Sequence, residues 1–196
     1  KKQLDVLCRS AAVKLVKGEQ KSISVSEKRL PQFLGHHEIR HEHVLANKEP
    51  GVITGLAWTA AGGEILFIET SLAPGKGNLI ITGQLGDVMK ESARIALSLV
   101  KHMYPEEAAK LEDHDLHIHV PAGAVPKDGP SAGITLTTAL ASLLTGKSVS
   151  PEYAMTGEVS LTGRVMPIGG LPEKLMAAER AGVKTVFIPK ENEEDL

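Results

Sequence analysis

The spacing of apolar residues changes along this chain and divides it into two parts. Residues 3–17 carry apolar side chains at helical spacing, and Gly18 follows as a stop signal. Residues 22–35 favour a short strand and a brief turn of helix that ends at Gly35. A loop-like stretch rich in polar residues, Pro and Gly follows, so the pattern predicts a boundary between residues 35 and 50.

Beyond this boundary, strand-like and helix-like segments alternate. The first expected elements are a hairpin of strands 52–58 and 64–70 that turns at Gly62-Gly63, a loop at 71–78 and a strand at 79–82. A helix at 87–103 capped by Asp87, a strand at 115–120 and an apolar helix at 134–146 are expected next. The last expected elements are strands at 153–161 and 163–168, a helix from Pro172 to Gly182, and a strand at 184–189. The strand–helix–strand order predicts a parallel crossover, and therefore a mixed α/β fold.

Composition excludes several classes of protein. The chain has 196 residues, 42% of them apolar and 23% charged, which is ordinary globular composition with room for a full domain and an appendage. The net charge of −2 gives no excess of positive charge that would attract nucleic acid or an anionic membrane. Cys8 is the single cysteine, so an internal disulfide framework is excluded. The chain lacks an apolar run of membrane-spanning length and a signal peptide, does not begin with Met, and is expected to be a piece of a longer protein.

His37-Glu38-Ile39-Arg40-His41 matches H-E-x-x-H, a zinc-binding signature of metallopeptidases. That chemistry needs a helix, on which both histidines share a face and the glutamate polarises the metal-bound water. Here the stretch is short and has no apolar face, and four histidines within eight residues favour a chance match. We therefore favour a solvated connector, with a zinc peptidase using His37, Glu38 and His41 as the alternative.

Two further patterns are weaker candidates. His117 and His119 share one face of a predicted strand with His114 nearby, and an exposed strand face explains them better than a metal site. Residues 141–148, ASLLTGKS, resemble a phosphate-binding loop, but Ala141 replaces the first glycine and the stretch ends a helix instead of opening one. Neither a metal nor a nucleotide site is therefore expected on this chain.

Ser131 lies in VPKDGPSAG, where a constrained loop meets the start of a helix. A serine at this position is commonly only a helix N-cap. The same geometry, however, directs backbone N–H groups and the positive end of the helix at one point, where an oxyanion could be held by Ser131, Ala132 or Gly129. A nucleophilic serine needs a base, and no histidine lies in an evident partner motif.

Lys174 could act as that base if its pKa fell. It lies in the first turn of the helix that follows Gly169-Gly170, where the positive helix end disfavours an ammonium. Three apolar neighbours would desolvate it: Leu171, Leu175 and Met176. Glu173 would oppose this effect if it faced the lysine, and the plain alternative is a surface lysine on an amphipathic helix.

The segments PKDGPSAG and MTGEVSLTGRVMPIGGLPEKLMAAERAG together resemble the proteolytic domain of Lon, the ATP-dependent protease family. GVITGLAWT, PGKGNLIITGQLGDVMKESA and HIHVPAGAVPKDGPSAGITLTTAL resemble it in the same order, so the resemblance covers about residues 51 to 195. It implies a compact mixed-sheet α/β domain, related to a domain of a ribosomal protein and of small-molecule kinases. Residues 1–35 look like the end of the helical lid of the family's ATPase module. Residues 36–50 would then be the connector, and residues 51–196 the proteolytic domain.

The resemblance also implies roles for single residues. Ser131 matches the nucleophile, and Lys174 matches the general base that later protonates the leaving amine. Thr156, in MTGE, matches a threonine that orients the lysine, and Asp128 matches an aspartate linked to switching between open and closed site forms. Pro172 departs from the GGLKEK of many relatives, although the place of the lysine is kept.

The implied function is an ATP-dependent serine endopeptidase of protein quality control, which degrades misfolded and regulatory proteins through a Ser-Lys dyad and an acyl-enzyme. The family forms homohexamers, and its ATP and Mg²⁺ bind in an ATPase module that is almost wholly outside this chain, so we expect no cofactor or metal here. A bacterial cytosol is the expected location, with the mitochondrial matrix as the alternative. A non-catalytic assembly domain is a further alternative, against which the presence of both Ser131 and Lys174 argues.

Overall fold

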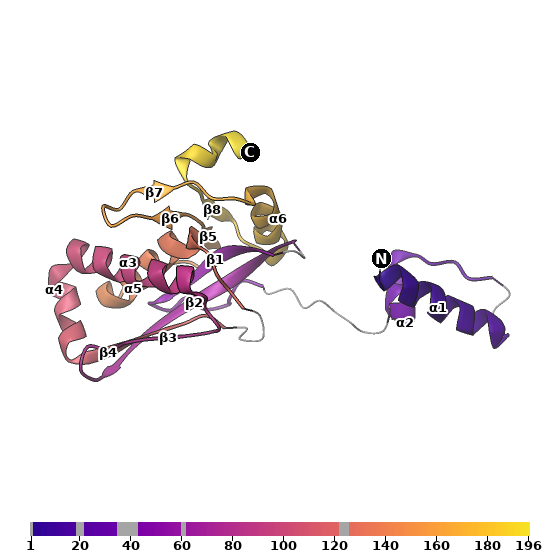
Figure 1. Cartoon of the computed structure of the whole chain (residues 1–196), viewed down its shortest axis with the longest axis horizontal. Coiled ribbons are helices and arrows are strands. Elements are labelled where there is room, and N and C mark those ends of the chain that lie inside the picture. Colours follow the sequence, from indigo (N-terminus) through magenta and orange to yellow (C-terminus); the bar gives the residue numbers. More distant parts are fainter. Residues whose placement is uncertain (1, 19–21, 35–42, 60–61, 122–125) are drawn as a thin grey trace. The chain divides into compact units, whose positions relative to one another are not determined.

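The structure is a computed structural model that describes residues 2–18, 22–34, 43–59, 62–121 and 126–196. The chain forms two compact units, Lys1–Arg40 and His41–Leu196 (Figure 1). The finer division of the chain at residues 35 and 50 stays a prediction.

The first unit is helical. It consists of α1 (Lys2–Val16), η1 (Glu27–Arg29) and α2 (Leu30–Leu34), with Phe33 buried under the ammonium of Lys14 at 4.7 Å from the ring centre. The helix predicted at 3–17 is confirmed. The short strand predicted after residue 22 is wrong, because no described residue of this unit pairs with that segment and a strand requires a partner.

The second unit is built on a six-stranded sheet in the order β3-β4-β2-β1-β5-β8 (Figure 1). Its strands are β1 (Val52–Thr59), β2 (Gly62–Pro74), β3 (Leu79–Thr82), β4 (His114–His119), β5 (Tyr153–Met155) and β8 (Thr185–Phe187). β1–β2 and β2–β4 are antiparallel, whereas β3–β4, β1–β5 and β5–β8 are parallel. The predicted mixed α/β fold with parallel crossovers is thereby confirmed. A separate hairpin joins β6 (Glu158–Val159) and β7 (Val165–Met166).

Helices cover both faces of this sheet. They are α3 (Asp87–Met103), α4 (Pro105–Ala108), η2 (Ala109–Glu112), η3 (Pro130–Ala132), α5 (Gly133–Thr145), α6 (Leu171–Ala181) and η4 (Lys190–Asp195). Ile53 and Ile68 pack with residues of α3 and α5 in the larger core. Leu56 and Phe67, which point to the other face, pack with residues of α6 in a smaller core. The two helices that begin near the site, α5 and α6, therefore lie on opposite faces of the sheet.

Three of the predicted strands have other bounds in the structure. β2 continues to Pro74 through the predicted loop, because its last residues pair with β4. The strand predicted at 153–161 is broken at Thr156-Gly157, between β5 and β6. The strand predicted at 163–168 is reduced to Val165–Met166.

The two glycines predicted as the hairpin turn are instead the first residues of β2. Gly62 pairs with Thr59 and Gly63 with Trp58, so the connection falls at 60–61, outside the described residues. A Cβ on Gly63 would collide with the backbone carbonyl of Glu173. Gly63 is therefore needed for the close approach of α6 to the sheet.

Candidate active site

Ser131 is the middle residue of η3, which leads directly into α5, so it lies at a helix start as the sequence predicts. The preceding Gly129 has φ +126°, a conformation that glycine adopts without strain. The carbonyl of Ser131 accepts a hydrogen bond from the Gly157 N–H at 2.8 Å and a longer one from Thr156 Oγ1 at 3.4 Å. The break between β5 and β6 thus holds the serine backbone in place.

Lys174 lies in the first turn of α6, which begins after Gly170 in the left-handed conformation. The lysine is 2% exposed, and its backbone N–H donates to the Gly170 carbonyl at 3.1 Å. Burial disfavours the ammonium and lowers the pKa of Lys174 from 10.5 to about 8. The surface-lysine alternative is therefore wrong for Lys174.

The neighbours of Lys174 only partly match the prediction. Leu171 is buried, but Met176 is 58% exposed and does not desolvate the lysine. Glu173 forms no ion pair with Lys174 among the described residues. The pKa of the lysine is therefore lowered by burial without an opposing carboxylate.

Thr156 joins the serine and lysine segments. Its hydroxyl accepts a hydrogen bond from Lys174 Nζ at 3.1 Å and donates toward the Ser131 carbonyl at 3.4 Å. The threonine is 1% exposed, and its backbone N–H donates to the Phe187 carbonyl at 3.1 Å. Thr156, directly after β5, thus contacts both the side chain of Lys174 in α6 and the backbone of Ser131 in η3.

The side chain of Asp128 binds the start of α3 and the loop before Ser131. Its Oδ1 accepts the backbone N–H of Met89 and that of Gly129, both at 2.9 Å. Asp128 thus caps α3 from a distant loop, and the prediction that Asp87 caps this helix is wrong, because the N-cap position is Gly86. In this arrangement the Gly129 N–H, one of the three predicted oxyanion donors, is occupied by Asp128.

Sequence reasoning missed Lys127, which ties the loop before the serine to the loop before α3. Its backbone N–H donates to the Gln84 carbonyl, its carbonyl accepts from Gly86, and its Nζ donates to the Gly83 carbonyl, all within 3.0 Å. Burial lowers the pKa of Lys127. These interactions hold Asp128 beside the start of α3.

A stretch of β1 next to the site was also missed. β5 pairs with β1 only at Thr54 and Gly55, and no ladder among the described residues continues on that edge toward Thr59. Trp58 lies on this stretch, is 58% exposed, and packs against the Gly170 backbone at the start of α6. The sequence shows only a tryptophan at the end of the predicted strand 52–58, and its exposure beside a strand edge is seen in the structure.

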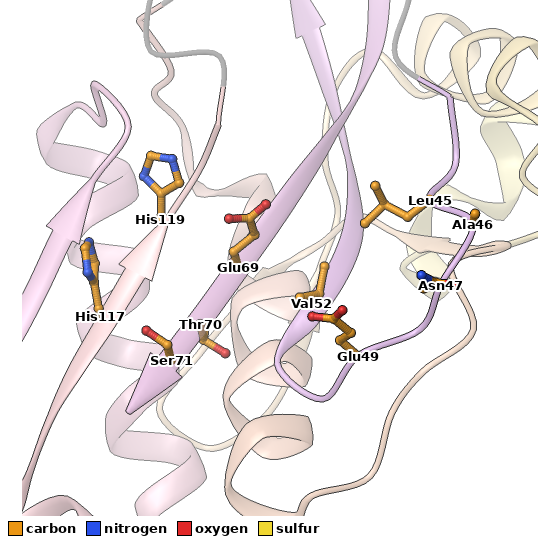
Figure 2. Close-up of a pocket in the computed structure, with 10 residues that line it drawn as sticks. All are labelled: Leu45, Ala46, Asn47, Glu49, Val52, Glu69, Thr70, Ser71, His117 and His119. Atoms are coloured by element: carbon orange, nitrogen blue, oxygen red, sulfur yellow. The ribbon is translucent and has the colours of Figure 1, made fainter. Parts of the chain in front are cut away.

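A pocket of about 640 Å³ lies elsewhere on the sheet (Figure 2). It is lined by Leu45, Ala46, Asn47, Glu49, Val52, Glu69, Thr70, Ser71, His117 and His119. Ser131, Thr156 and Lys174 are not among its lining residues. The pocket is therefore separate from the serine and the lysine.

The histidines offer no preformed metal centre in the part of the chain that the structure describes. His117 and His119 both hydrogen-bond to the hydroxyl of Thr82, at 2.8 and 2.7 Å. No group of three or more potential ligands is found among the described residues. The zinc motif at His37, Glu38 and His41 lies outside the described residues. The stretch at 141–148 ends α5 as predicted, with Gly146 as the left-handed cap.

A serine at a helix start and a buried lysine that share Thr156 as a partner are compatible with a nucleophile and its base. The family model described as "Lon protease (S16) C-terminal proteolytic domain" matches residues 24–196. The chain is 54% identical to Lon protease 1 of Bacillus subtilis, over all of this chain and 26% of that protein. It is 53% identical to the Lon proteases of Methanosarcina barkeri and Clostridium beijerinckii, over all of this chain and 25% of each. The chain therefore belongs to the Lon proteolytic domain family.

The chain spans about a quarter of the length of the curated relatives it matches. Its family supports the peptidase interpretation over both the zinc peptidase and the non-catalytic assembly domain. In the described residues, none of the helices combines the length and apolarity needed to cross a membrane.

Proposed function

We propose that this chain is the peptide-cleaving part of an ATP-dependent serine endopeptidase, with Ser131 as nucleophile and Lys174 as general base. The observation that carries the proposal is the environment of the lysine. Lys174 is 2% exposed, its pKa is lowered to about 8, and its Nζ donates to Thr156, which in turn contacts the Ser131 backbone. A base with a pKa near the working pH is suited to accept and return a proton.

In the first half-reaction, neutral Lys174 removes the proton from Ser131 Oγ while that oxygen bonds to the carbonyl carbon of the scissile peptide. The carbonyl oxygen becomes an oxyanion, which the backbone N–H groups of Ser131 and Ala132 would stabilise at the positive start of α5. The intermediate collapses, the C–N bond breaks, and the lysine ammonium gives its proton to the leaving amine. The acyl group stays on Ser131 as an ester.

In the second half-reaction, neutral Lys174 takes a proton from a water molecule as the water oxygen attacks the ester carbonyl. The C–O bond to Ser131 then breaks, and the lysine returns its proton to the serine oxygen. Thr156 supports both steps by accepting a hydrogen bond from Nζ. This bond fixes the amine while its lone pair remains available to the serine or the water.

The substrate would lie along residues 56–58 of β1, beyond the two residues of this strand that pair with β5. A peptide that adds to this edge as a strand has its backbone held by main-chain hydrogen bonds, which makes binding tolerant of sequence. Trp58 adds an exposed aromatic surface next to the start of α6. Unfolded or damaged proteins would meet this requirement, because their backbone is free to pair.

For the full-length protein we propose the context that the family resemblance implies. The protein would assemble as a homohexamer in the bacterial cytosol, and ATP with Mg²⁺ would bind outside this chain and drive the delivery of unfolded substrates. By itself, the chain would cleave small peptides weakly and without ATP.

Hydrolysis of a fluorogenic peptide by purified variants tests the dyad. Ser131→Ala and Lys174→Ala should each lose cleavage, and the double variant should lose no more than either single one, because the two residues act as a unit. Ser148→Ala and Lys184→Ala, at exposed positions, serve as matched controls that keep activity. Chelation of metals should have no effect on the wild-type rate. Full activity of either dyad variant, or loss of activity on chelation, would overturn the proposal.

A further inference from the structure

The side chain of Asn192, in η4, pairs with the backbone of Ile168 in the manner of a neighbouring strand. Its Oδ1 accepts the Ile168 N–H at 2.9 Å, and its Nδ2 donates to the Ile168 carbonyl at 2.9 Å. The second proton of Nδ2 is directed to Asp195 Oδ2 at 2.6 Å. Asn192 is 3% exposed, so these bonds form where water does not compete for them.

Ile168 lies two residues before Gly170, the N-cap of the helix that carries Lys174. The segment from Pro167 to Gly170 belongs to no strand or helix, so its position depends on what holds its backbone. Asn192 engages both the donor and the acceptor of Ile168. It therefore fixes the position of the backbone just before α6. The position of Lys174, in the first turn of that helix, depends on it.

The same C-terminal segment also holds Thr156. The Phe187 carbonyl accepts the Thr156 backbone N–H at 3.1 Å, and Phe187 pairs with Met155 in the sheet. Within residues 187–192, Phe187 therefore binds the backbone of Thr156 directly, whereas Asn192 binds Ile168, just ahead of the helix that carries Lys174. A shift of this segment would move the lysine relative to the threonine.

We infer that Asn192 is a positioning residue for Lys174, acting by fixing the backbone of Ile168 ahead of α6. This inference rests on the proposed Ser-Lys function. It names a residue that touches neither the serine nor the lysine and whose effect reaches the site through the backbone. A misplacement of the order of 1 Å of a reacting group costs up to about 100-fold in rate.

The test compares Asn192→Ala with Glu191→Ala, its neighbour on η4. Glu191 forms only an exposed ion pair with Arg164 and serves as the matched control. Asn192→Ala should lower kcat for a fluorogenic peptide about 10- to 100-fold with little change in KM, whereas Glu191→Ala should match the wild type. Asn192→Asp keeps the acceptor for the Ile168 N–H and loses both donors, so its kcat should fall between the two.

A purely structural role is separated from positioning by the titration of Lys174, followed by NMR of ¹³C-labelled lysine in the folded variants. With α6 loosened and its first turn hydrated, the pKa of Lys174 should rise from about 8 toward 10.5 in Asn192→Ala and stay unchanged in Glu191→Ala. If Asn192→Ala does not fold, the same two measurements on Asn192→Asp decide the matter. An unchanged kcat together with an unchanged Lys174 titration would overturn the inference.

Failure of the proposed function has a different signature. If Ser131→Ala and Lys174→Ala remain active, the dyad itself is wrong, whatever the Asn192 variants do. If both are inactive while the Asn192 variants behave as the wild type, the dyad stands and only the positioning role is lost.

Discussion

Lys174 Nζ donates a hydrogen bond to Thr156 Oγ1 at 3.1 Å, with 2% and 1% of the two residues exposed. The threonine hydroxyl is the acceptor, and it can accept from either the ammonium or the neutral amine. Because the bond is somewhat more favourable for the charged form, it opposes the effect of burial on the lysine pKa.

Replacing Thr156 by valine removes this acceptor and keeps the shape of the side chain. The lysine loses its orientation, so kcat/KM for a peptide should fall about 10- to 100-fold. The ammonium also loses a partner, so the acidic limb of the pH–rate profile should move below pH 8. Thr156→Ser, which keeps the hydroxyl, should retain the wild-type profile. A limb that moved upward in Thr156→Val would contradict this account.

The buried lysine should also make stability depend on pH. Its pKa is about 8 in the folded chain and 10.5 when unperturbed, so between these values the unfolded chain binds more protons. The free energy of unfolding should therefore rise with pH across this window, by up to about 3 kcal/mol from this group. Lys174→Met should lack this rise and be the more stable variant below pH 8.

Denaturant unfolding at several pH values between 8 and 10.5 measures the effect. Lys184→Met, at an exposed position, is the control that should keep the wild-type slope. Equal slopes for wild type and Lys174→Met would show that the lysine is not buried in solution.

Asp128 should contribute to stability through the start of α3. Removing its carboxylate in Asp128→Ala leaves the Met89 N–H without its acceptor, which should cost about 1 kcal/mol. Asp87→Ala should cost much less, because Asp87 forms only an exposed contact with Lys90. Chemical denaturation of the two variants compares these costs. A larger loss of stability in Asp87→Ala than in Asp128→Ala would show that Asp87 caps α3, as the sequence predicts.

Gly63 should be sensitive to any added side chain. In Gly63→Ala the new methyl group meets the Glu173 carbonyl, so the first turn of α6 must shift. We expect a loss of about 1–3 kcal/mol in stability and a fall in peptide cleavage, since Lys174 is the next residue. Gly169→Ala places its methyl group in open space and should be close to neutral in stability. Equal melting temperatures for the two variants would contradict the close packing of α6 on β2.

The sequence was a good guide to long periodic elements. Residues 87–103 form α3 with the predicted bounds, and the helices at Ser131 and Lys174 begin where the loop glycines and prolines indicated. These features depend on local backbone preferences, which a single sequence carries. The regular apolar face of residues 87–103, and the glycines and prolines in the loops around Ser131 and before Lys174, were sufficient signals.

Features that depend on distant partners could not be predicted in this way. β2 extends to Pro74 because β4 pairs with it, and α3 is capped by Asp128 from a loop 39 residues away in sequence. The strand break at Thr156 is visible only once the Ser131 carbonyl is known to need a partner. Asn192 gave no signal, because its importance lies in the backbone of Ile168 that it contacts.

The most direct test of the central claim is degradation of an unfolded protein by the full-length protein with ATP, with variants compared side by side. We predict that Ser131→Ala and Lys174→Ala lose degradation while His37→Ala, in the zinc-like motif, keeps it. Each variant should still assemble and hydrolyse ATP, which shows that the loss lies in peptide cleavage. Retained degradation in Ser131→Ala or Lys174→Ala, or loss in His37→Ala alone, would contradict the Ser-Lys mechanism and return the chemistry to the histidine-rich segment.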